Sequence, residues 1–279
     1  MRDRFEGILV DGRSLGGIAT TLAFPEMALT VDIGVCTPAA LRTATVAITH
    51  THADHVAGLH QYLAIRRLYG MAAPRLIAPK AALPVLQSHI EVIGALQGRP
   101  FEPQVIGLGH QDECDLGRNL VLRAFEVTHS ARIPCLGYVV LRRQKKLKQE
   151  YRGLNSAEII RLKDKADLFE LRDDPLVAVT GDAVAGAFSE PLAQRARVLF
   201  MECTFVGGGR DVEAAHVGGH VHLNELVPLL STITSPVIVL YHFSQIYRSL
   251  ELQEHLNARL PAEELRRVRF LLPEEGDRM

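Results

Sequence analysis

The sequence has no tryptophan, only four cysteines and no long uninterrupted apolar run. No stretch approaches the ~18 apolar residues that a membrane span needs, so we expect no membrane partner. The first residues, Met1–Glu6, are rich in charge and lack the apolar segment of a secretory signal, so we expect a cytoplasmic protein. A chain of 279 residues needs no disulfides, and Cys36, Cys114, Cys135 and Cys203 lack CxxC spacing, so reduced thiols are expected.

Net charge is also nearly absent. Lysine and arginine number 31 and the acidic residues 32, which leaves a formal charge of −1. This balance excludes the global positive field that is typical of non-specific nucleic-acid binders. A nucleic-acid partner would therefore be bound by a local patch or by the active site itself.

The order of apolar segments indicates the fold class. In the first part of the chain we expect a helix at Ala57–Tyr69 and strands at Ile18–Phe24, Ala28–Asp32, Thr45–Thr49, Arg75–Ala78, Val105–Leu108, Leu120–Val127 and Leu136–Leu141. After Pro175 we expect alternating strands and helices, namely Leu176–Thr180, Val198–Met201, Leu223–Leu230 (helix), Val237–Tyr241 and Leu250–Leu260 (helix). Two such halves predict an α/β (α+β) fold, a four-layer αβ/βα sandwich. Without a repeat or a linker, residues 1–279 are expected to form a single domain.

One segment at about residues 142–175 does not fit this core. It opens with the basic run Arg142–Lys148 and continues with a helix-like stretch from Ser156 to Ala166. The run is either the solvated tip of a hairpin or an arm-like insertion that neutralises phosphates.

The strongest signal is His50-Thr51-His52-Ala53-Asp54-His55, directly after the expected strand Thr45–Thr49. Side chains at i and i+2 of an extended backbone point the same way, so His50 and His52 can converge on one metal. Asp54 and His55 lie on the turn into the next helix and face a second metal beside the first. Four ligand-type residues in six positions are not expected from a chance cluster of histidines.

Further ligands are expected just after other strands, where a shared edge of the sheets collects them. His129 follows Leu120–Val127, Asp182 follows Leu176–Thr180, and His242 follows Val237–Tyr241. We expect His50, His52 and His129 on the first metal, Asp54, His55 and His242 on the second, and Asp182 as the bridge.

The kind of metal follows from the ligands. Nitrogen and carboxylate donors without thiolate favour zinc, with manganese or iron as alternatives. The expected cofactor is two Zn²⁺ per subunit. Positions left open for water and substrate are typical of a catalytic site, and zinc lowers the pKa of bound water towards about 7.

These residues resemble a known family. His50–His55 followed by Val56–Leu59 is similar to the HxHxDH motif of metallo-β-lactamase-fold hydrolases. More specific blocks resemble ribonuclease Z, the tRNA 3′-processing endonuclease, in its short plant-type form. The blocks are Gly137–Val140, Val179–Asp182, Met201–Phe205, Gly219–His222 and His242–Tyr247, which span nearly the whole chain in the family's order.

The resemblance implies further roles. A histidine before the last ligand assists the leaving oxygen, which corresponds to His220, and a glutamate that orients it corresponds to Glu202. His222 is the rival of His220 for this role and is otherwise substrate-side or structural. Asp54 is expected to orient the attacking hydroxide as well as to bind metal. The implied substrate is 3′-extended precursor tRNA, and the implied assembly is a homodimer in which the arm of one subunit holds tRNA bound to the other.

The sequence also departs from the family. Gln245-Ile246 stands where the family has a residue followed by arginine, and the segment between Leu141 and Pro175 lacks the Gly-Pro-rich arm of many bacterial members. Two alternatives therefore stay open. One is a phosphodiesterase of the same fold acting on a cyclic nucleotide or another small ester, and the other is a non-catalytic, metal-stabilised RNA-binding protein.

Overall fold

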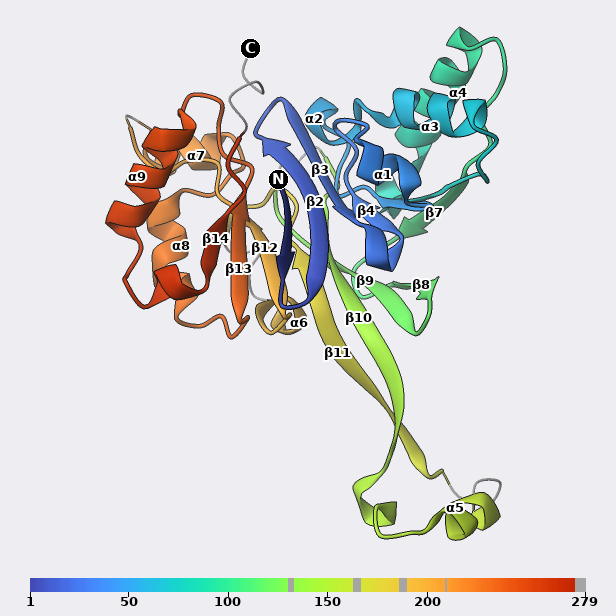
Figure 1. Ribbon diagram of the computed structural model, residues 1–279. Coiled ribbons are helices and arrows are strands. Elements are labelled where there is room, and N and C mark those ends of the chain that lie inside the picture. Colours follow the sequence, from blue (N-terminus) through green and yellow to red (C-terminus); the bar gives the residue numbers. More distant parts are fainter. Residues whose placement is uncertain (130–132, 163–166, 186–189, 209, 274–279) are drawn as a thin grey trace.

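The computed structural model describes residues 1–129, 133–162, 167–185, 190–208 and 210–273, which form two seven-stranded sheets and a projecting arm (Figure 1). The first sheet has the order β1 (Arg2–Phe5), β2 (Ile8–Leu15), β3 (Ala19–Phe24), β4 (Leu29–Val31), β5 (Thr45–Ala47), β6 (Arg75–Pro79) and β7 (Gln104–Leu108). The second has the order β14 (Val268–Phe270), β13 (Val237–Tyr241), β12 (Val198–Glu202), β11 (Phe169–Val179), β10 (Leu136–Leu147), β9 (Leu120–Glu126) and β8 (Glu113–Gly117).

The two sheets repeat one topology. Each begins with four antiparallel strands (β1–β4 and β8–β11) and continues with three strands that run parallel to the last of these. Parallel neighbours need crossover connections, and helices supply most of them. The carboxyl ends of the parallel strands therefore gather functional side chains at one edge of each sheet.

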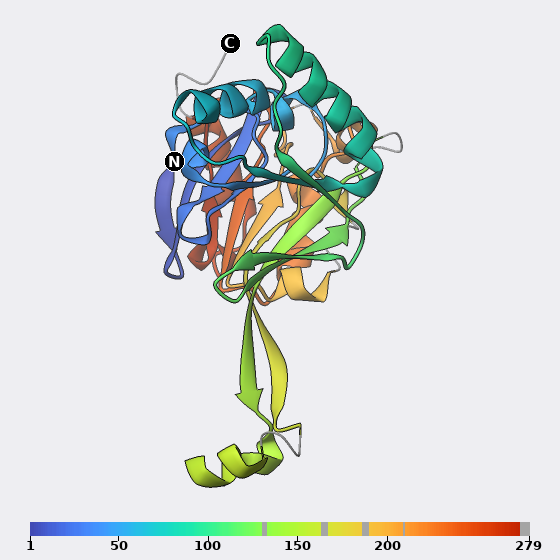
Figure 2. The same ribbon diagram turned by 90° about the vertical axis from the view of Figure 1, so that its right-hand side faces the viewer.

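Helices cover the outer faces of both sheets (Figures 1 and 2). The first sheet is associated with α1 (Pro38–Arg42), α2 (Ala53–Val56), α3 (Leu59–Leu68) and α4 (Leu83–Leu96), and the second with α6 (Pro191–Gln194), α7 (Val212–Val217), α8 (Leu223–Leu230) and α9 (Ser249–Arg259). One apolar core lies between the sheets, and each outer helical layer packs a core of its own. The predicted four-layer αβ/βα sandwich is confirmed.

Most expected elements are present, with shifted ends. The predicted helix Ala57–Tyr69 is α3, which is shorter and is preceded by the separate short helix α2. Helix α4 is absent from the sequence-based expectations. Its solvent-facing side carries Val85, Val92 and Leu96, which are 65%, 59% and 72% exposed, so the contrast between an apolar and a polar face is weak.

The basic segment is not a hairpin tip, which corrects one of its two interpretations. Most of Arg142–Lys148 lies on strand β10, which pairs with β11 far beyond the sheet to build the projecting arm. The far end of the arm holds a short 3₁₀ turn, Gln149–Tyr151, and α5 (Ser156–Leu162). Of the predicted helix Ser156–Ala166, residues 163–166 lie outside the described residues.

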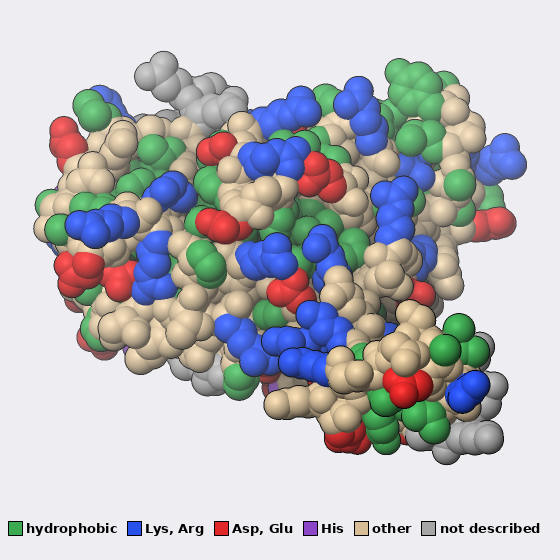
Figure 3. Space-filling model, turned by 60° about the horizontal axis from the view of Figure 1, so that its bottom comes forward, with side chains coloured by type: hydrophobic (Ala, Val, Ile, Leu, Met, Phe, Trp, Pro, Cys, Tyr) green, Lys and Arg blue, Asp and Glu red, His purple; other side chains and the backbone are tan. Residues whose placement is uncertain are grey.

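Arginine and lysine side chains gather beside the arm (Figure 3). Not all of them are available to a ligand. Arg143 donates to Glu113 and Asp173 at 2.8 Å, and Lys148 donates to Asp167 at 2.7 Å. The exposed cations of the two arm strands are Arg142, Lys145, Lys146 and Arg172.

The state of the cysteines and the length of the helices bear on two expectations from the composition. All four cysteines are free thiols, and two of them, Cys135 and Cys203, are buried. Among the described residues, no helix is both long and apolar enough to cross a lipid bilayer.

Candidate metal centre

The predicted ligands come from the carboxyl ends of strands in both sheets. His50 follows β5 by three residues, and His52, whose backbone is extended, precedes the first residue of α2. Asp54 and His55 lie within the single turn of α2, as the sequence predicts. His129 follows β9, Asp182 follows β11 and His242 follows β13, so the site spans the gap between the two sheets.

The first cluster contains three imidazoles from both sheets. His52 Nδ1 lies 2.9 Å from His50 Nε2 and 3.2 Å from His129 Nε2. Asp182 Oδ2 lies 3.7 Å from His50 Nε2 and completes a group of four potential donors. Tetrahedral zinc with bonds of 2.0–2.1 Å requires ligand atoms roughly 3.3 Å apart, which these spacings approach.

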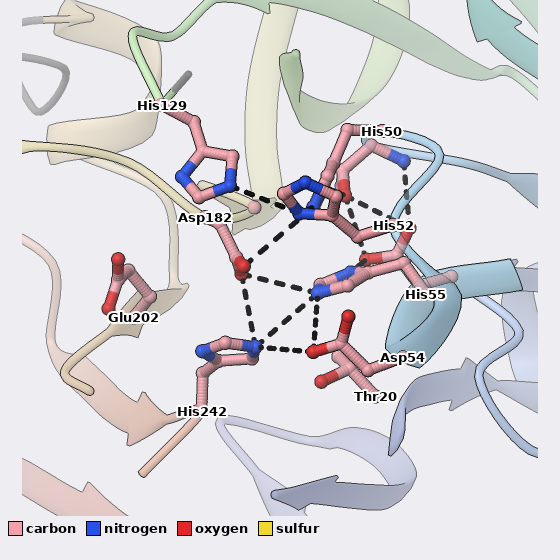
Figure 4. Close-up of polar contacts among 12 residues, drawn as sticks. Thr20, His50, His52, Asp54, His55, His129, Asp182, Glu202 and His242 are labelled. Carbon is pink, nitrogen blue, oxygen red and sulfur yellow. Dashed lines mark hydrogen bonds and ion pairs between the residues drawn. The ribbon is translucent and has the colours of Figure 1, made fainter. Parts of the chain in front are cut away.

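The second cluster shares Asp182 with the first (Figure 4). Its Oδ1 lies 3.3 Å from His55 Nε2 and 3.4 Å from His242 Nε2, which are themselves 3.4 Å apart. Asp54 Oδ2 is 3.2 Å from His242 Nε2 and 3.6 Å from His55 Nε2. The two oxygens of Asp182 thus face two different sets of ligands, which is the geometry of a bridging carboxylate.

The ring orientation of the histidines is set by hydrogen bonds behind them. In four of them Nδ1 lies against a protein oxygen, which leaves Nε2 with its lone pair facing the cluster. The pairs are His50 with Thr49 Oγ1 (3.1 Å), His55 with Asp32 Oδ2 (2.7 Å), His129 with Gly219 O (2.7 Å) and His242 with Thr204 Oγ1 (3.0 Å). Such outer contacts are typical of metal-binding histidines.

The electrostatics of this buried site favour a cation. Burial opposes the ionised forms, yet the neighbouring imidazoles His242 and His55 lower the pKa of Asp182 and keep it charged. Despite burial, Asp182 and Asp32 raise the pKa of His55. Within the described residues Asp182 Oδ1 is buried and accepts no hydrogen bond. A bound metal ion would satisfy this buried oxygen. The donor set therefore fits divalent metal.

A histidine–glutamate pair lies beside the clusters. His220 Nδ1 is 3.1 Å from Glu202 Oε1, and its ring stacks against His242 with centroids 5.4 Å apart. Glu202 is fully buried and accepts hydrogen bonds from the backbone N–H groups of Ala183, Val221 and Thr204 and from the Thr204 hydroxyl. Because these donors occupy both oxygens, Glu202 orients His220 rather than offering itself to a metal.

The Glu202 carboxylate also affects the charge of this histidine. Burial disfavours the imidazolium, but the hydrogen bond to Glu202 and the nearby charges of Asp182 and Asp54 raise the pKa of His220 to about 9. Among the described residues its Nε2 atom makes no hydrogen bond. The geometry therefore places a histidine with a raised pKa at the edge of the clusters.

Comparison with known proteins gives the same family as the sequence motifs. The sequence-family model named β-lactamase superfamily domain matches residues 35–148 of this chain. tRNase Z TRZ1 of Arabidopsis thaliana is 34% identical over 264 residues, covering 92% of this chain and 93% of the relative. The chain belongs to the tRNase Z family.

Two further matches agree with this membership. The chloroplastic tRNase Z TRZ2 of Arabidopsis thaliana is 31% identical over 255 residues, covering 89% of this chain and 71% of the relative. The crystal structure of the short form of human tRNase Z superimposes with a TM-score of 0.61 at 17% identity, covering 95% of this chain and 96% of that chain. At that identity the structural likeness shows the shared fold alone.

The structure separates the two candidate histidines of this tRNase Z family member. His222 precedes α8 and its Nδ1 accepts from the Asn224 N–H at 3.1 Å, while its Nε2 donates to the Arg210 carbonyl. It therefore caps a helix instead of facing the clusters. His220 is the one that reaches them.

Residues that the sequence did not single out support the ligands. Asp32 is buried at the end of β4, binds His55, and accepts from the N–H of Thr49 at 2.7 Å. Gly17 donates its N–H to Asp54 Oδ2 at 2.9 Å from the turn between β2 and β3. The sequence could have pointed to Asp32 by its position alone, because Asp32 follows β4, and β4 pairs with β5, the strand that leads to His50. Asp32 and His242 have φ of 58° and 65°, strained values for side chains of this kind.

Proposed function

We propose that this chain is a metal-dependent endoribonuclease that removes the 3′ trailer from precursor tRNA. The observation that carries the proposal is the pair of donor clusters sharing Asp182, with His220 and Glu202 directly beside them. The family membership supports the choice of substrate, since the two Arabidopsis relatives bear the name tRNase Z. Precursor tRNA is the partner we expect this site to bind.

Each donor cluster is proposed to hold one zinc ion. His50, His52 and His129 would hold the first ion, Asp54, His55 and His242 would hold the second, and Asp182 lies in both donor clusters. Bound there, the ions would supply a water of lowered pKa and positive charge for the phosphoryl oxygens. Manganese and iron accept the same nitrogen and oxygen donors.

The chain's own residues direct the reaction. Asp54, held by the Gly17 N–H and His242, orients the attacking oxygen on one side of phosphorus. His220, fixed by Glu202, gives the Nε2 proton to the departing ribose 3′ oxygen. The bond from phosphorus to that oxygen breaks as the new bond to oxygen forms, which leaves a 3′-hydroxyl on the tRNA and a 5′-phosphate on the trailer.

The projecting arm supports a role in holding RNA. The exposed cations of its two strands, Arg142, Lys145, Lys146 and Arg172, can neutralise phosphates on a chain with almost no net charge. We propose a single domain, residues 1–279, from which the arm at about 142–175 extends, and a homodimer in which the arm of one subunit grips tRNA bound to the other. The proposed place of action is the cytoplasm.

Cleavage of a 3′-extended precursor tRNA by the purified protein tests the proposal. Cutting near the discriminator base should stop with chelator and return with Zn²⁺. An activated small diester, bis(p-nitrophenyl) phosphate, runs in parallel. Hydrolysis of the small ester alone would keep the metal chemistry and overturn tRNA as the substrate. Chelator-insensitive cutting would overturn the metal dependence.

A further inference from the structure

A groove of about 520 Å³ opens beside His129, next to the first donor cluster. Its walls come from the ends of β6 and β7 and from the segments that leave β9 and enter β10. The chemically distinctive side chains in it are Lys80, His110 and Glu126, together with apolar Leu108 and Ile133. None of these residues belongs to the clusters, so the site described above does not account for them.

The order of the first sheet explains why these groups lie in line with the site. Strands β5, β6 and β7 are parallel neighbours, so their carboxyl ends share one edge. His50 follows β5, Lys80 follows β6 directly, and His110 follows β7 by two residues. The edge therefore runs from the metal ligands past Lys80 to His110, with His129 of the second sheet closing it.

The groups along this edge are donors that suit a nucleotide. Lys80 is exposed, and among the described residues its ammonium forms no hydrogen bond or salt bridge. His110 Nδ1 accepts from the Glu126 N–H at 3.1 Å, so the proton of the neutral ring sits on Nε2 as a fixed donor. The volume lies within the range of small-ligand pockets and suits one nucleotide.

Among the described residues that line the groove, Glu126 carries the one acidic side chain, and it repels phosphate at its own position. This places the phosphate at the Lys80 side and leaves the other wall for a base or a sugar. When one phosphate of an RNA strand lies at the donor clusters, the neighbouring nucleotides must occupy the space beside the clusters. This groove lies directly beside His129 of the first cluster.

We propose that this groove binds a nucleotide flanking the scissile phosphate, with Lys80 on its phosphate and His110 donating a hydrogen bond. This inference rests on the proposed function. The flanking nucleotide comes either from the trailer or from the tRNA side of the cut, and both offer the same phosphate and base chemistry.

The test uses Lys80→Ala and Lys80→Arg with precursor tRNA and with bis(p-nitrophenyl) phosphate. Lys80→Ala should raise KM for the RNA about tenfold and leave kcat within about twofold, because a contact to a charged group is lost in binding. Lys80→Arg should recover most of the affinity. Hydrolysis of the small ester should not change. Arg99→Ala removes another exposed cation beyond the far end of α4, roughly 20 Å along that helix, and serves as the matched control.

A binding measurement adds a readout that a general structural role would not move. In chelator, without turnover, the slope of log Kd against log salt should be smaller for Lys80→Ala by roughly 0.7–0.9, since one phosphate contact is missing. His110→Ala should weaken binding without changing this slope. Trailers of different length separate the two sources of the nucleotide: a penalty that disappears with shorter trailers assigns the groove to the trailer, and a constant penalty assigns it to the tRNA side.

Two outcomes distinguish this inference from the function on which it rests. Normal RNA cleavage with unchanged KM and salt slope in Lys80→Ala would overturn the groove and leave the endoribonuclease intact. Wild-type protein that neither binds nor cuts RNA would overturn both.

Discussion

The Nδ1 atom of His55 lies 2.7 Å from Oδ2 of Asp32, and both side chains are fully buried. Asp32 fixes the ring so that Nε2 faces Asp182 and His242. The same carboxylate accepts the N–H and hydroxyl of Thr49, the residue immediately before His50. One buried acid thus positions the second cluster directly and the start of the first through the backbone.

Asp32→Asn should weaken metal binding while the fold persists. The amide oxygen can still accept from the Thr49 N–H, but the charge that orients and polarises His55 is lost. Removal of such outer contacts typically lowers metal affinity 10–100-fold. Competition with a chromophoric chelator measures the affinity, and circular dichroism checks the fold. Wild-type affinity in the folded variant would show that Asp32 has only a structural role.

Asp182→Ala should lose metal and activity together, because this residue is the only one that the two four-residue clusters share. Elemental analysis after desalting is expected to find less than one ion per chain. Asp54→Ala, which removes a donor from the second cluster alone, is the matched control and should keep about one ion. Two retained ions in Asp182→Ala would contradict the bridge.

His220→Ala should keep both ions and lose rate. Positioned proton transfer contributes typically 10²–10⁴-fold, so kcat on precursor tRNA should fall in that range. Hydrolysis of bis(p-nitrophenyl) phosphate should change little, because nitrophenolate leaves without a proton. His222→Asn keeps a capping side chain before α8 and should retain the wild-type rate. Normal RNA turnover by His220→Ala would exclude this histidine as the acid.

The stabilising contribution of Glu113, at the base of the arm, should decrease at acidic pH. Hydrogen bonds from Arg143, opposed by partial burial and aided by Arg123, lower the pKa of Glu113 to about 2 from its usual 4.5. A carboxyl group whose pKa is lowered by folding stabilises the fold above pH 4.5 and loses that contribution as the pH falls towards 2.

Glu113→Gln should therefore cost about 1 kcal/mol in the free energy of unfolding at pH 7, since solvent screens this partly exposed network. The difference from wild type should shrink steadily below pH 4.5. Urea denaturation at pH 7 and at pH 3 measures it. An equal difference at both values would show that the charge of Glu113 contributes nothing.

The sequence by itself identified the candidate ligand residues, because they follow from local rules. Alternation in an extended chain aligned His50 with His52, and strand ends marked His129, Asp182 and His242 as residues that a common edge could collect. The layered fold was equally accessible, since buried strands leave continuous apolar runs and amphipathic helices leave a period of 3.6 residues. Where exposed positions are also apolar, as on α4, this signal fades, and the helix was missed. Where burial is missing, as along the arm, the end of the strand was missed.

Only the tertiary structure decided which residues support the ligands. The contact of His55 with Asp32 joins residues 23 positions apart, and the hydrogen bond from the Gly17 N–H to Asp54 joins residues 37 positions apart. The alignment of Lys80 and His110 with the site depends on the sheet order β5–β6–β7. Hydrophobic periodicity specifies which face of a strand is buried, but neighbouring strands are chosen by the packing of the whole chain. The ligands could therefore be read from local pattern, whereas the groups that orient them and the groove beside them required the fold.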